Sequence, residues 1–445
     1  MTTTYDPSHK HYYDEADLRV ELERVFEICH GCRLCFNLCP AFPTLFDTID
    51  SLDGAVSRMQ PSDHDRVIDE CYQCKLCYLK CPYIPPHEWE LDFPRLIARA
   101  YALRRSSGKA TVTERVADQF LGRTDLLGKA STSVAPLVNM LTSKRGSASR
   151  RVMQRAVGIA SERLLPPYAR QRFSTWFARR NGAMIGSPRG EVAVFPTCFV
   201  EYMEPAIGMD LVKVYERNDV SCVLADGARC CGAPWLHGGN VPEFRRSARR
   251  NVTVLAAEVR AGRDVVVPQP TCAYVIRKDY PRYLGGIEGE SARGAQIAAD
   301  AAMVAEHTFD AAEYLLRAHR NSGRPLDTEF NGHVPEKVTY HLSCHTRAQT
   351  MGSPSRDLLA LAGMKVNVLQ GCSGIDGTWG YRAENYALAK KVAGKLCRSV
   401  DASSGELCGD CHLANGAIRE ETGLVPLHPL QLLARAYGIP EERST

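Results

Sequence analysis

Eight cysteines near the N-terminus stand in two runs with identical internal spacing. The runs begin at Cys29 and Cys71, and each reads C-x2-C-x2-C-x3-C-P. This is the spacing of chains that bind two [4Fe–4S] clusters, in which three close thiolates surround one cluster and the fourth reaches the other. A pair of structural zinc sites is the alternative, but zinc favours two separated C-x2-C pairs and four ligands in all. The pattern predicts two clusters, one held by Cys29, Cys32, Cys35 and Cys81, the other by Cys71, Cys74, Cys77 and Cys39.

Eight further cysteines lie in the C-terminal half of the chain, close to the ends of predicted strands. Soft iron favours thiolate ligands, and thiolates from separate loops can close around a cluster. Buried, reduced core cysteines are the alternative, and we prefer that interpretation for Cys222, in a strand, and Cys397, on a helix. The candidate cofactor ligands form two sets, Cys198, Cys230, Cys231 and Cys272 in the first, and Cys344, Cys372, Cys408 and Cys411 in the second.

Alternating strands and helices must position these two sets. Strands are predicted over 191–196, 220–224 and 264–267, and again over 337–342 and 365–369; helices are predicted over 206–216, 242–261, 355–362 and 383–399. Landmarks recur in the same order: Cys198 to Cys344 is 146 residues, Cys231 to Ser373 is 142, and Cys272 to Cys411 is 139. Such a regular offset indicates an internal repeat, in which cysteines at strand ends converge on a ligand.

The N-terminal runs require different supports. Residues 11–28 have helical apolar spacing, residues 63–65 open a second predicted helix, and residues 95–103 form a third. The 31 residues between Cys39 and Cys71 are too many for a compact bacterial ferredoxin. The predicted fold class is therefore an α-helical two-cluster ferredoxin domain followed by a duplicated α/β domain. The expected segments are 1–103 for the ferredoxin, 104–188 for a partly helical connector, 189–330 for the first repeat and 331–445 for the second.

The composition is that of a globular protein in a reducing compartment. The chain has 445 residues, of which 44 % are hydrophobic, 24 % are charged and 18 are cysteines. Residues 1–27 show no secretory segment, and no stretch has the length and hydropathy of a membrane-spanning helix. Cysteines at ligand spacing in such a chain indicate metal binding rather than disulfides. We expect a cytoplasmic protein. Peripheral binding to the cytoplasmic face of a membrane is compatible with this expectation.

The connector is strongly basic. Residues 104–180 contain sixteen Lys and Arg but four Asp and Glu, whereas the whole chain has a net charge of +4. Aromatic and aliphatic groups beside arginines over residues 166–177 fit a helix lying on an anionic lipid surface, and residues 151–165 are also expected to be helical. A solvated linker packed on its own protein is the alternative. Nucleic-acid binding is disfavoured because no recognition motif accompanies the charge.

These motifs carry a resemblance to a known family. The two C-terminal sets resemble the cysteine-rich CCG domain, with the pattern C…CCG…CxxC, which occurs in the catalytic subunit of heterodisulfide reductase and in iron–sulfur subunits of flavin-dependent dehydrogenases. Together with the N-terminal runs, and with residues 372–381, the chain is similar to the iron–sulfur subunits of anaerobic glycerol-3-phosphate dehydrogenase and of glycolate oxidase. Two positions depart from the pattern: Gln269 replaces the first cysteine of CxxC, and Ser373 replaces the second cysteine of CCG. Four thiolates per repeat disfavour five-cysteine noncubane clusters.

Three functions fit these observations. The first is an electron-transfer subunit that passes electrons from a flavoprotein dehydrogenase, of the glycerol-3-phosphate or 2-hydroxy acid type, to a membrane quinone or another acceptor. No glycine-rich dinucleotide fingerprint is present, so we expect any flavin on a partner protein. The second, implied by the resemblance, is a heterodisulfide reductase-like enzyme that reduces a disulfide at the repeats. The third is a scaffold without redox function. His345 and His412 each follow a candidate ligand and are expected to support the ligand shell rather than to donate protons.

Overall fold

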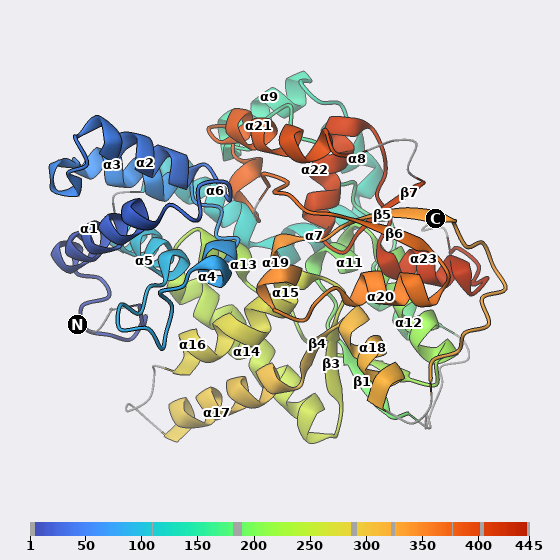
Figure 1. Cartoon of the computed structure of the whole chain (residues 1–445). Helices are drawn as coiled ribbons and strands as arrows, with labels where there is room; N and C mark the ends of the chain where they lie inside the picture. The colour runs from blue at the N-terminus through green and yellow to red at the C-terminus, as the bar shows by residue number, and fades with distance from the viewer. Residues whose placement is uncertain are drawn as a thin grey trace.

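The computed structural model describes residues 5–108, 110–180, 189–285, 292–321, 325–375, 377–400 and 405–442. Lys109 and residues 181–188 of the predicted connector, and Asp376, lie outside the described residues. Figure 1 shows a helical N-terminal domain beside two α/β regions, which we call the first half (189–321) and the second half (325–442). No helix in the described ranges has the length and hydropathy needed to cross a bilayer.

The N-terminal domain consists of helices around a small aromatic core. Asp14 caps the first helix, whose N-terminus lies four residues after the predicted start, and the second predicted helix begins at Pro61, where a capping box joins Gln60 and Asp63. Apolar faces of these helices enclose Phe26, Phe42 and other rings. The elements are α1 (Glu15–Cys32), α2 (Ala41–Ser51), the 3-10 turn η1 (Val56–Arg58), α3 (Pro61–Asp69), α4 (Leu76–Lys80) and α5 (Phe93–Ser106).

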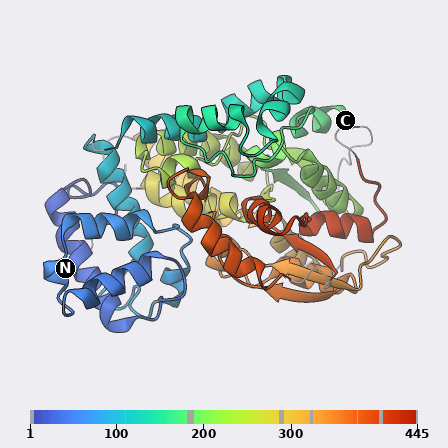
Figure 2. The same ribbon diagram turned by 90° about the horizontal axis from the view of Figure 1, so that it is seen from above.

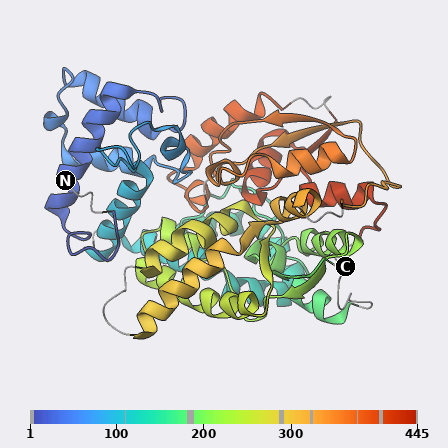
Figure 3. The ribbon, with the colours of Figure 1, turned by 60° about the horizontal axis from the view of Figure 1, so that its bottom comes forward.

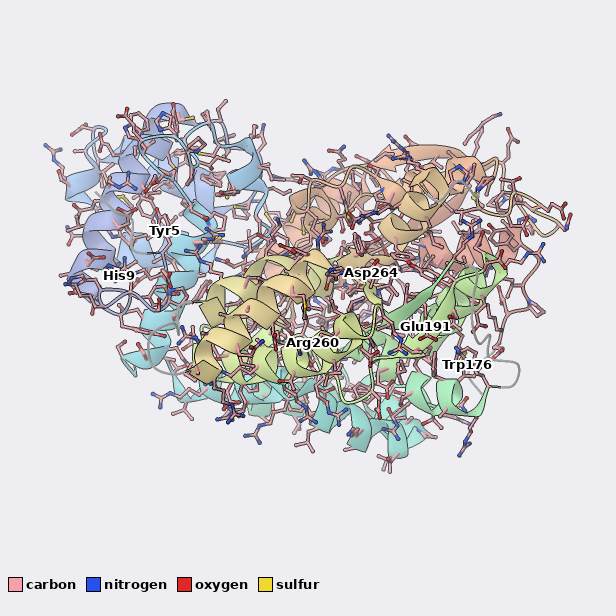
Figure 4. The ribbon with its side chains drawn as sticks, turned by 90° about the horizontal axis from the view of Figure 1, so that it is seen from below. Tyr5, His9, Trp176, Glu191, Arg260 and Asp264 are labelled. Atoms are coloured by element: carbon pink, nitrogen blue, oxygen red, sulfur yellow. The ribbon has the colours of Figure 1, made fainter. Side chains whose placement is uncertain are left out.

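The connector is a chain of short helices along one edge of the molecule (Figure 2). The helix expected over 151–165 ends at Val157, because Gly158 adopts a left-handed conformation (φ 70°) that terminates it. Of the two alternatives for the aromatic segment, the structure favours packing on the protein itself: Phe173 is buried, and Trp176, labelled in Figure 4, is partly buried against the core and donates to Glu442 at 2.5 Å. The helices are α6 (Val112–Gly122), α7 (Thr124–Ser133), α8 (Ala135–Thr142), α9 (Ala148–Val157) and α10 (Phe173–Arg179).

The first half contains a four-stranded parallel sheet with the order β2-β1-β3-β4. Val192 of β1 pairs with Cys222 of β2 and with Asp264 of β3. The three predicted strands are present, and the sequence analysis missed the short edge strand β4. The elements are β1 (Glu191–Val194), α11 (Cys198–Tyr202), α12 (Pro205–Arg217), β2 (Ser221–Leu224), α13 (Ala233–His237), α14 (Val241–Arg260), β3 (Asp264–Val267), α15 (Pro270–Tyr274), the π-helical turn η2 (Val275–Asp279), α16 (Tyr280–Gly285), α17 (Ala292–Glu306), β4 (Thr308–Asp310) and α18 (Ala311–Asn321).

The second half contains a three-stranded parallel sheet with the order β6-β5-β7. Its first strand, β5, lies in the centre, with the second strand, β6, on one side and the third strand, β7, on the other. The strands β2-β1-β3 of the first half have the same arrangement. The prediction did not include β7. The elements are β5 (Lys337–His341), α19 (Cys344–Ala348), α20 (Pro354–Leu361), β6 (Lys365–Leu369), the 3-10 turn η3 (Trp379–Tyr381), α21 (Tyr386–Cys397), β7 (Glu406–Gly409), α22 (His412–Thr422) and α23 (Pro429–Ala436).

The two halves share one hydrophobic core. Val194 and Leu211 of the first half belong to the same buried cluster as Tyr340 and Leu433 of the second. Figure 3 shows the two α/β regions packed against each other, with the N-terminal domain beside both. Since the carboxyl ends of parallel strands carry the connecting loops, this packing places the cysteine loops of both halves in the interior of the molecule.

Candidate metal centres

The first group of thiols lies where α1 ends. Arg33 has a left-handed backbone (φ 54°), so the chain turns directly after Cys29 and Cys32 and brings Cys35 back toward them. Burial raises the pKa of the Cys29 thiol well above its usual range, and the neighbouring thiols of Cys35, Cys81 and Cys32 raise it further. The structure thus brings together the four cysteines that the spacing assigns to one cluster.

The second group forms around Cys77. Burial raises the pKa of this thiol well above its usual range, and the thiols of Cys74, Cys71 and Cys39 add to the effect. Burial likewise raises the pKa of the Cys39 thiol, and the thiols of Cys71 and Cys74 add to the effect. The exchange between the runs is therefore present in the geometry, because Cys39 joins the second group and Cys81 joins the first.

The two groups differ in their access to solvent. Cys71, Cys74 and Cys77 are buried, whereas all four thiols of the first group are partly exposed. The loops that carry the first group also expose Leu34 and Phe36, each by about half of the side chain. The first group therefore faces outward, and the second faces the rest of the molecule.

The donor set of both groups fits [4Fe–4S] clusters. Four thiols per group come from one C-x2-C-x2-C run and one remote Cys-Pro, the set that ligates such clusters. Burial keeps uncoordinated thiols protonated, as the raised pKa of Cys35, about 11, illustrates. Coordination by iron would stabilise the thiolates and couple cluster binding to folding.

The first half also brings its four candidate ligands together. Cys198 lies at the start of α11, after β1, and Cys230 and Cys231 follow β2. Side-chain hydrogen bonds connect Cys198 to Cys230, Cys230 to Cys231, and Cys231 to Cys272. These bonds lower the pKa of the Cys230 thiol and raise the pKa of Cys198 and Cys231. Next to them, Gly232 has a φ of 87°, and a side chain there would contact the Phe244 ring at 3.0 Å.

Buried polar groups hold this thiol set in place. Asp125, on α7 of the connector, accepts hydrogen bonds from the Cys230 backbone N–H at 2.9 Å and from the Tyr202 hydroxyl at 3.2 Å. Burial raises the pKa of its carboxyl group to about 6. Asn251, fully buried on α14, donates to the Cys230 carbonyl at 3.1 Å, and the Tyr280 hydroxyl donates to the Cys231 carbonyl at 2.9 Å. The connector and α14 together fix the loop.

The second half distributes its four candidate ligands among different surroundings. Cys344 and Cys372 pack in one hydrophobic cluster with Cys39 and Cys74 of the N-terminal domain. Cys408 is fully buried within the shared core, and burial raises the pKa of its thiol well above the usual range. Cys411 accepts a hydrogen bond from the amide of Gln269 at 3.6 Å, and burial raises the pKa of its thiol to about 11.

Aromatic rings join the N-terminal domain to the second half. Tyr72, between Cys71 and Cys74, meets Trp379 edge to face, with ring centroids 4.5 Å apart. The indole N–H of Trp379 donates to the Asp69 carbonyl at 2.7 Å. The second thiol group and the loops of Cys344 and Cys372 therefore form one packed unit.

Comparisons with known proteins agree with this geometry. Residues 22–107 match the citrate utilization protein B Fer4-like domain, and residues 192–277 match the cysteine-rich CCG domain. The C-subunit of anaerobic glycerol-3-phosphate dehydrogenase from Escherichia coli K12 is 31% identical over 322 residues, covering 72% of this chain and 76% of the relative. The chain belongs to the family of this C-subunit.

More distant relatives extend the family. Lactate utilization protein A of Bacillus licheniformis is 26% identical over 254 residues, covering 55% of this chain and 98% of the relative. The B-subunit of fumarate reductase (CoM/CoB) from Methanothermobacter marburgensis is 26% identical over 266 residues, covering 57% of this chain and 47% of the relative. Components of a dehydrogenase and of a reductase among the relatives identify the chain as an iron–sulfur component of an oxidoreductase. Because the CCG match lies within the first half, over residues 192–277, a duplication of this domain stays a prediction.

One departure from the cysteine pattern has a visible structural role. Gln269 is buried in the first half, donates to Cys411 and accepts from the His412 backbone N–H at 3.5 Å, both in the second half. A cysteine thiol is only a weak donor and a weak acceptor, whereas the glutamine amide provides a full donor and a full acceptor. Gln269 therefore connects the two halves at the position where the CCG pattern has a thiol.

The two histidines beside candidate ligands are buried and neutral. Burial lowers the pKa of His345 and of His412 to about 3 each. His345 shares a hydrogen bond with Thr271 at 3.2 Å, and His412 stacks on Phe199 with ring centroids 3.5 Å apart. Both rings therefore pack between the halves.

The sequence analysis did not identify Asp125 and Asn251 as residues that support the thiols. Asp125 lies in a basic segment 105 residues before Cys230, from whose backbone N–H it accepts a hydrogen bond, and no motif connects the two. Asn251 was detectable in principle, because it interrupts the apolar face that Ala248, Val252 and Leu255 form on α14.

Proposed function

We propose that this chain is the electron-transfer subunit of a dehydrogenase complex. A flavoprotein partner oxidises glycerol-3-phosphate or a 2-hydroxy acid, and its electrons cross this chain to a membrane quinone or another acceptor. When bound, the iron–sulfur clusters would supply the one-electron carriers. The observation that carries the proposal is the continuous packing from the partly exposed first thiol group, through the buried second group, to Cys344 and Cys372.

Three features of the N-terminal domain support electron transfer. The loops with Leu34 and Phe36 offer an apolar contact for the redox partner next to the first thiol group. The second group is insulated from water, which suits a one-electron path because burial excludes side reactions. The ring contact between Tyr72 and Trp379 keeps the N-terminal domain and the second half in a fixed relation.

The test uses the anaerobically purified protein and its flavoprotein partner. Iron–sulfur absorbance should bleach when glycerol-3-phosphate or a 2-hydroxy acid is added together with the flavoprotein, and should remain unchanged without it. A chain that carries its own flavin and oxidises the substrate alone would contradict the proposal.

The connector provides a surface for membrane contact. Eight of the fifteen exposed large hydrophobic side chains in the described residues lie between residues 112 and 152, seven of them on α6 to α9; Leu137 and Met140 are 53% and 67% exposed. Lys and Arg outnumber acids in the same segment. Apolar side chains among cationic ones fit an anionic lipid surface. This surface differs from the aromatic segment suggested by the sequence.

Charge reversal tests this surface. The double variant Leu137→Glu, Met140→Glu should sediment about tenfold less with vesicles of phosphatidylglycerol and phosphatidylcholine. The two glutamates remove apolar side chains that the lipid would cover, and their negative charge is repelled by the anionic lipid. Val20→Glu, at an equally exposed position (67%) on α1, is the matched control and should sediment as the wild type does. Equal sedimentation of all three proteins would refute membrane contact through α8.

Disulfide reduction at the first half is the second candidate, and the connected thiols favour it. The poor access of a substrate to these thiols opposes disulfide reduction, because Cys230, Cys231 and Cys272 are only 6%, 3% and 5% exposed. A nearby cavity of about 190 Å³ is lined by Asp125, Tyr202 and Arg229, without a thiol in its wall. An assay of disulfide turnover with reduced viologen decides: a relay should be inactive, and turnover would favour the reductase.

A further inference from the structure

A cavity of about 300 Å³ lies where all parts of the chain meet. The N-terminal domain contributes Cys71 to its wall, the connector contributes Asp118, the first half His237, and the second half Trp379. Its volume is at the lower end of the range for small-molecule sites. A ligand in this cavity would contact a residue of the second thiol group directly.

His237 supplies the polar recognition group. Both of its ring nitrogens are buried, and neither has a hydrogen-bond partner within the described part of the chain. A neutral imidazole offers one N–H donor and one acceptor. Since buried polar groups are almost always hydrogen-bonded in native proteins, His237 indicates a ligand that carries an oxygen able to accept from it.

Three arginines in the cavity lining are already paired with acids, and of the two further acids of the lining, Glu114 is partly exposed and Glu384 is exposed to solvent. Arg104 donates to Asp69 at 2.5 Å, and Arg105 and Arg382 both donate to Asp118. The cavity therefore offers no unpaired charge from these groups to an anionic or cationic ligand. A neutral ligand with polar edges fits this lining better.

The remaining wall is aromatic and adjoins the connector surface. Trp379 is held by its bond to the Asp69 carbonyl and by Tyr72, so its ring is fixed next to the cavity. Flat conjugated rings stack on such a surface. Helix α6 supplies Asp118 to the cavity and exposes Val112 by 75% on the outside, so the cavity borders the surface proposed for membrane contact.

We propose that this cavity binds a quinone, the ring lying beside Trp379 and one carbonyl oxygen accepting a hydrogen bond from His237. This inference rests on the proposed electron-transfer function and assigns its acceptor site. Reduction of the quinone to the hydroquinone takes up two electrons, which come from the substrate of the flavoprotein, and two protons from water. His237 positions the ring against the wall that contains Cys71.

Binding of menadione, a soluble naphthoquinone, to the anaerobically purified holoprotein tests the site by calorimetry. The wild type should bind one molecule per chain. His237→Phe keeps a planar ring but removes the hydrogen bond, and should bind about tenfold more weakly. His333→Phe, at an exposed position outside the cavity lining, is the matched control and should bind as the wild type does.

A second variant tests the cavity independently, in case His237→Phe does not fold. Thr378→Phe fills the cavity from the second half and should abolish binding while the iron content stays that of the wild type. Protein reduced with dithionite should be reoxidised by menadione in the wild type and in His333→Phe, but about tenfold more slowly in His237→Phe.

The outcomes separate the two proposals. If the wild type binds no menadione, or both cavity variants bind it as tightly as the wild type, the cavity is not the quinone site, although reduction by the flavoprotein could still occur. If the flavoprotein fails to reduce the clusters while menadione binds in a manner sensitive to His237, the electron-transfer proposal fails and the binding site stands.

Discussion

The two α/β halves have the same central strand order but treat their cysteines differently. In the first half four thiols meet in one hydrogen-bonded series, braced by Asp125 and Asn251. In the second half two thiols face the N-terminal domain, one is enclosed in the core and one contacts Gln269. Strand ends bring loops together, but the residues between the loops decide whether the thiols meet. Similar cysteine spacing can therefore provide a ligand site in one half and a docking surface in the other.

The largest expected effect distinguishes the two thiol sets by their iron. Cys231→Ser should lower the iron content of anaerobically purified protein by about four atoms per chain, the content of one cubane, because it removes a thiol from the connected set. Cys408→Ser should leave the iron content unchanged, since this thiol lies in the core. Iron and acid-labile sulfide analysis measures both, and equal losses would show that the halves do not differ.

The junction between the halves should respond to pH. Burial raises the pKa of Asp210, on α12, from 3.8 to about 7, so the folded state binds a proton that the unfolded state releases. The wild type should therefore lose stability as pH rises from about 4 to 7. The variant Asp210→Asn has no carboxyl group to ionise and should not lose this stability. The free energy of unfolding of the variant minus that of the wild type should therefore increase by up to about 4 kcal/mol between pH 4 and pH 8. Urea unfolding at both pH values measures this change, and a constant difference would show that Asp210 is ionised in the folded protein.

Two buried asparagines separate support of the thiols from general stability. Asn251→Leu removes hydrogen bonds to Arg229, Cys230 and Tyr280 and should cost about 3 kcal/mol and lower the iron content. The matched variant Asn218→Leu loses bonds to Val214 and Asp327, away from any candidate ligand. It should be similarly destabilised in urea but keep its iron. Loss of iron in both variants would mean that instability alone explains the effect.

The smallest effect concerns the bridge between the halves. Gln269→Ala removes the donor to Cys411 and the acceptor for His412, and should destabilise the protein by about 1 kcal/mol. Amide hydrogen exchange at His412 should become faster, because its N–H loses its acceptor. Unchanged exchange would show that another group accepts this bond.

The sequence predicted what depends on short-range spacing. The N-terminal cysteines group as their spacing indicates, because three of each four lie in one tight turn. The predicted strands of both halves are present, because their buried residues form short apolar runs. It could not predict the contact between Cys39 and the loop of Cys372, which depends on how separate domains pack.

The elements missed by the sequence analysis have equally physical causes. Strand β4 (Thr308–Asp310) has one apolar residue of three, and β7 (Glu406–Gly409) begins with an acid and ends with a glycine, so neither shows the apolar run that marks β1 and β3. Trp176 beside arginines suggested a lipid contact, but its ring packs partly buried against the shared core and donates to Glu442, near the far end of the chain. Asp125 approaches Cys230 only because the connector wraps the first half.

The contact of Trp379 with Tyr72 also sets an order for biosynthesis. The ribosome completes the second cysteine run about 300 residues before it reaches Trp379, an interval of roughly 15–60 s at ordinary rates of synthesis. During that interval no second half exists to cover Cys71 and Cys74. The nascent N-terminal domain is open to iron and sulfide in this time, and completion of the chain then packs Trp379 against Tyr72 and leaves Cys71 in the wall of the cavity.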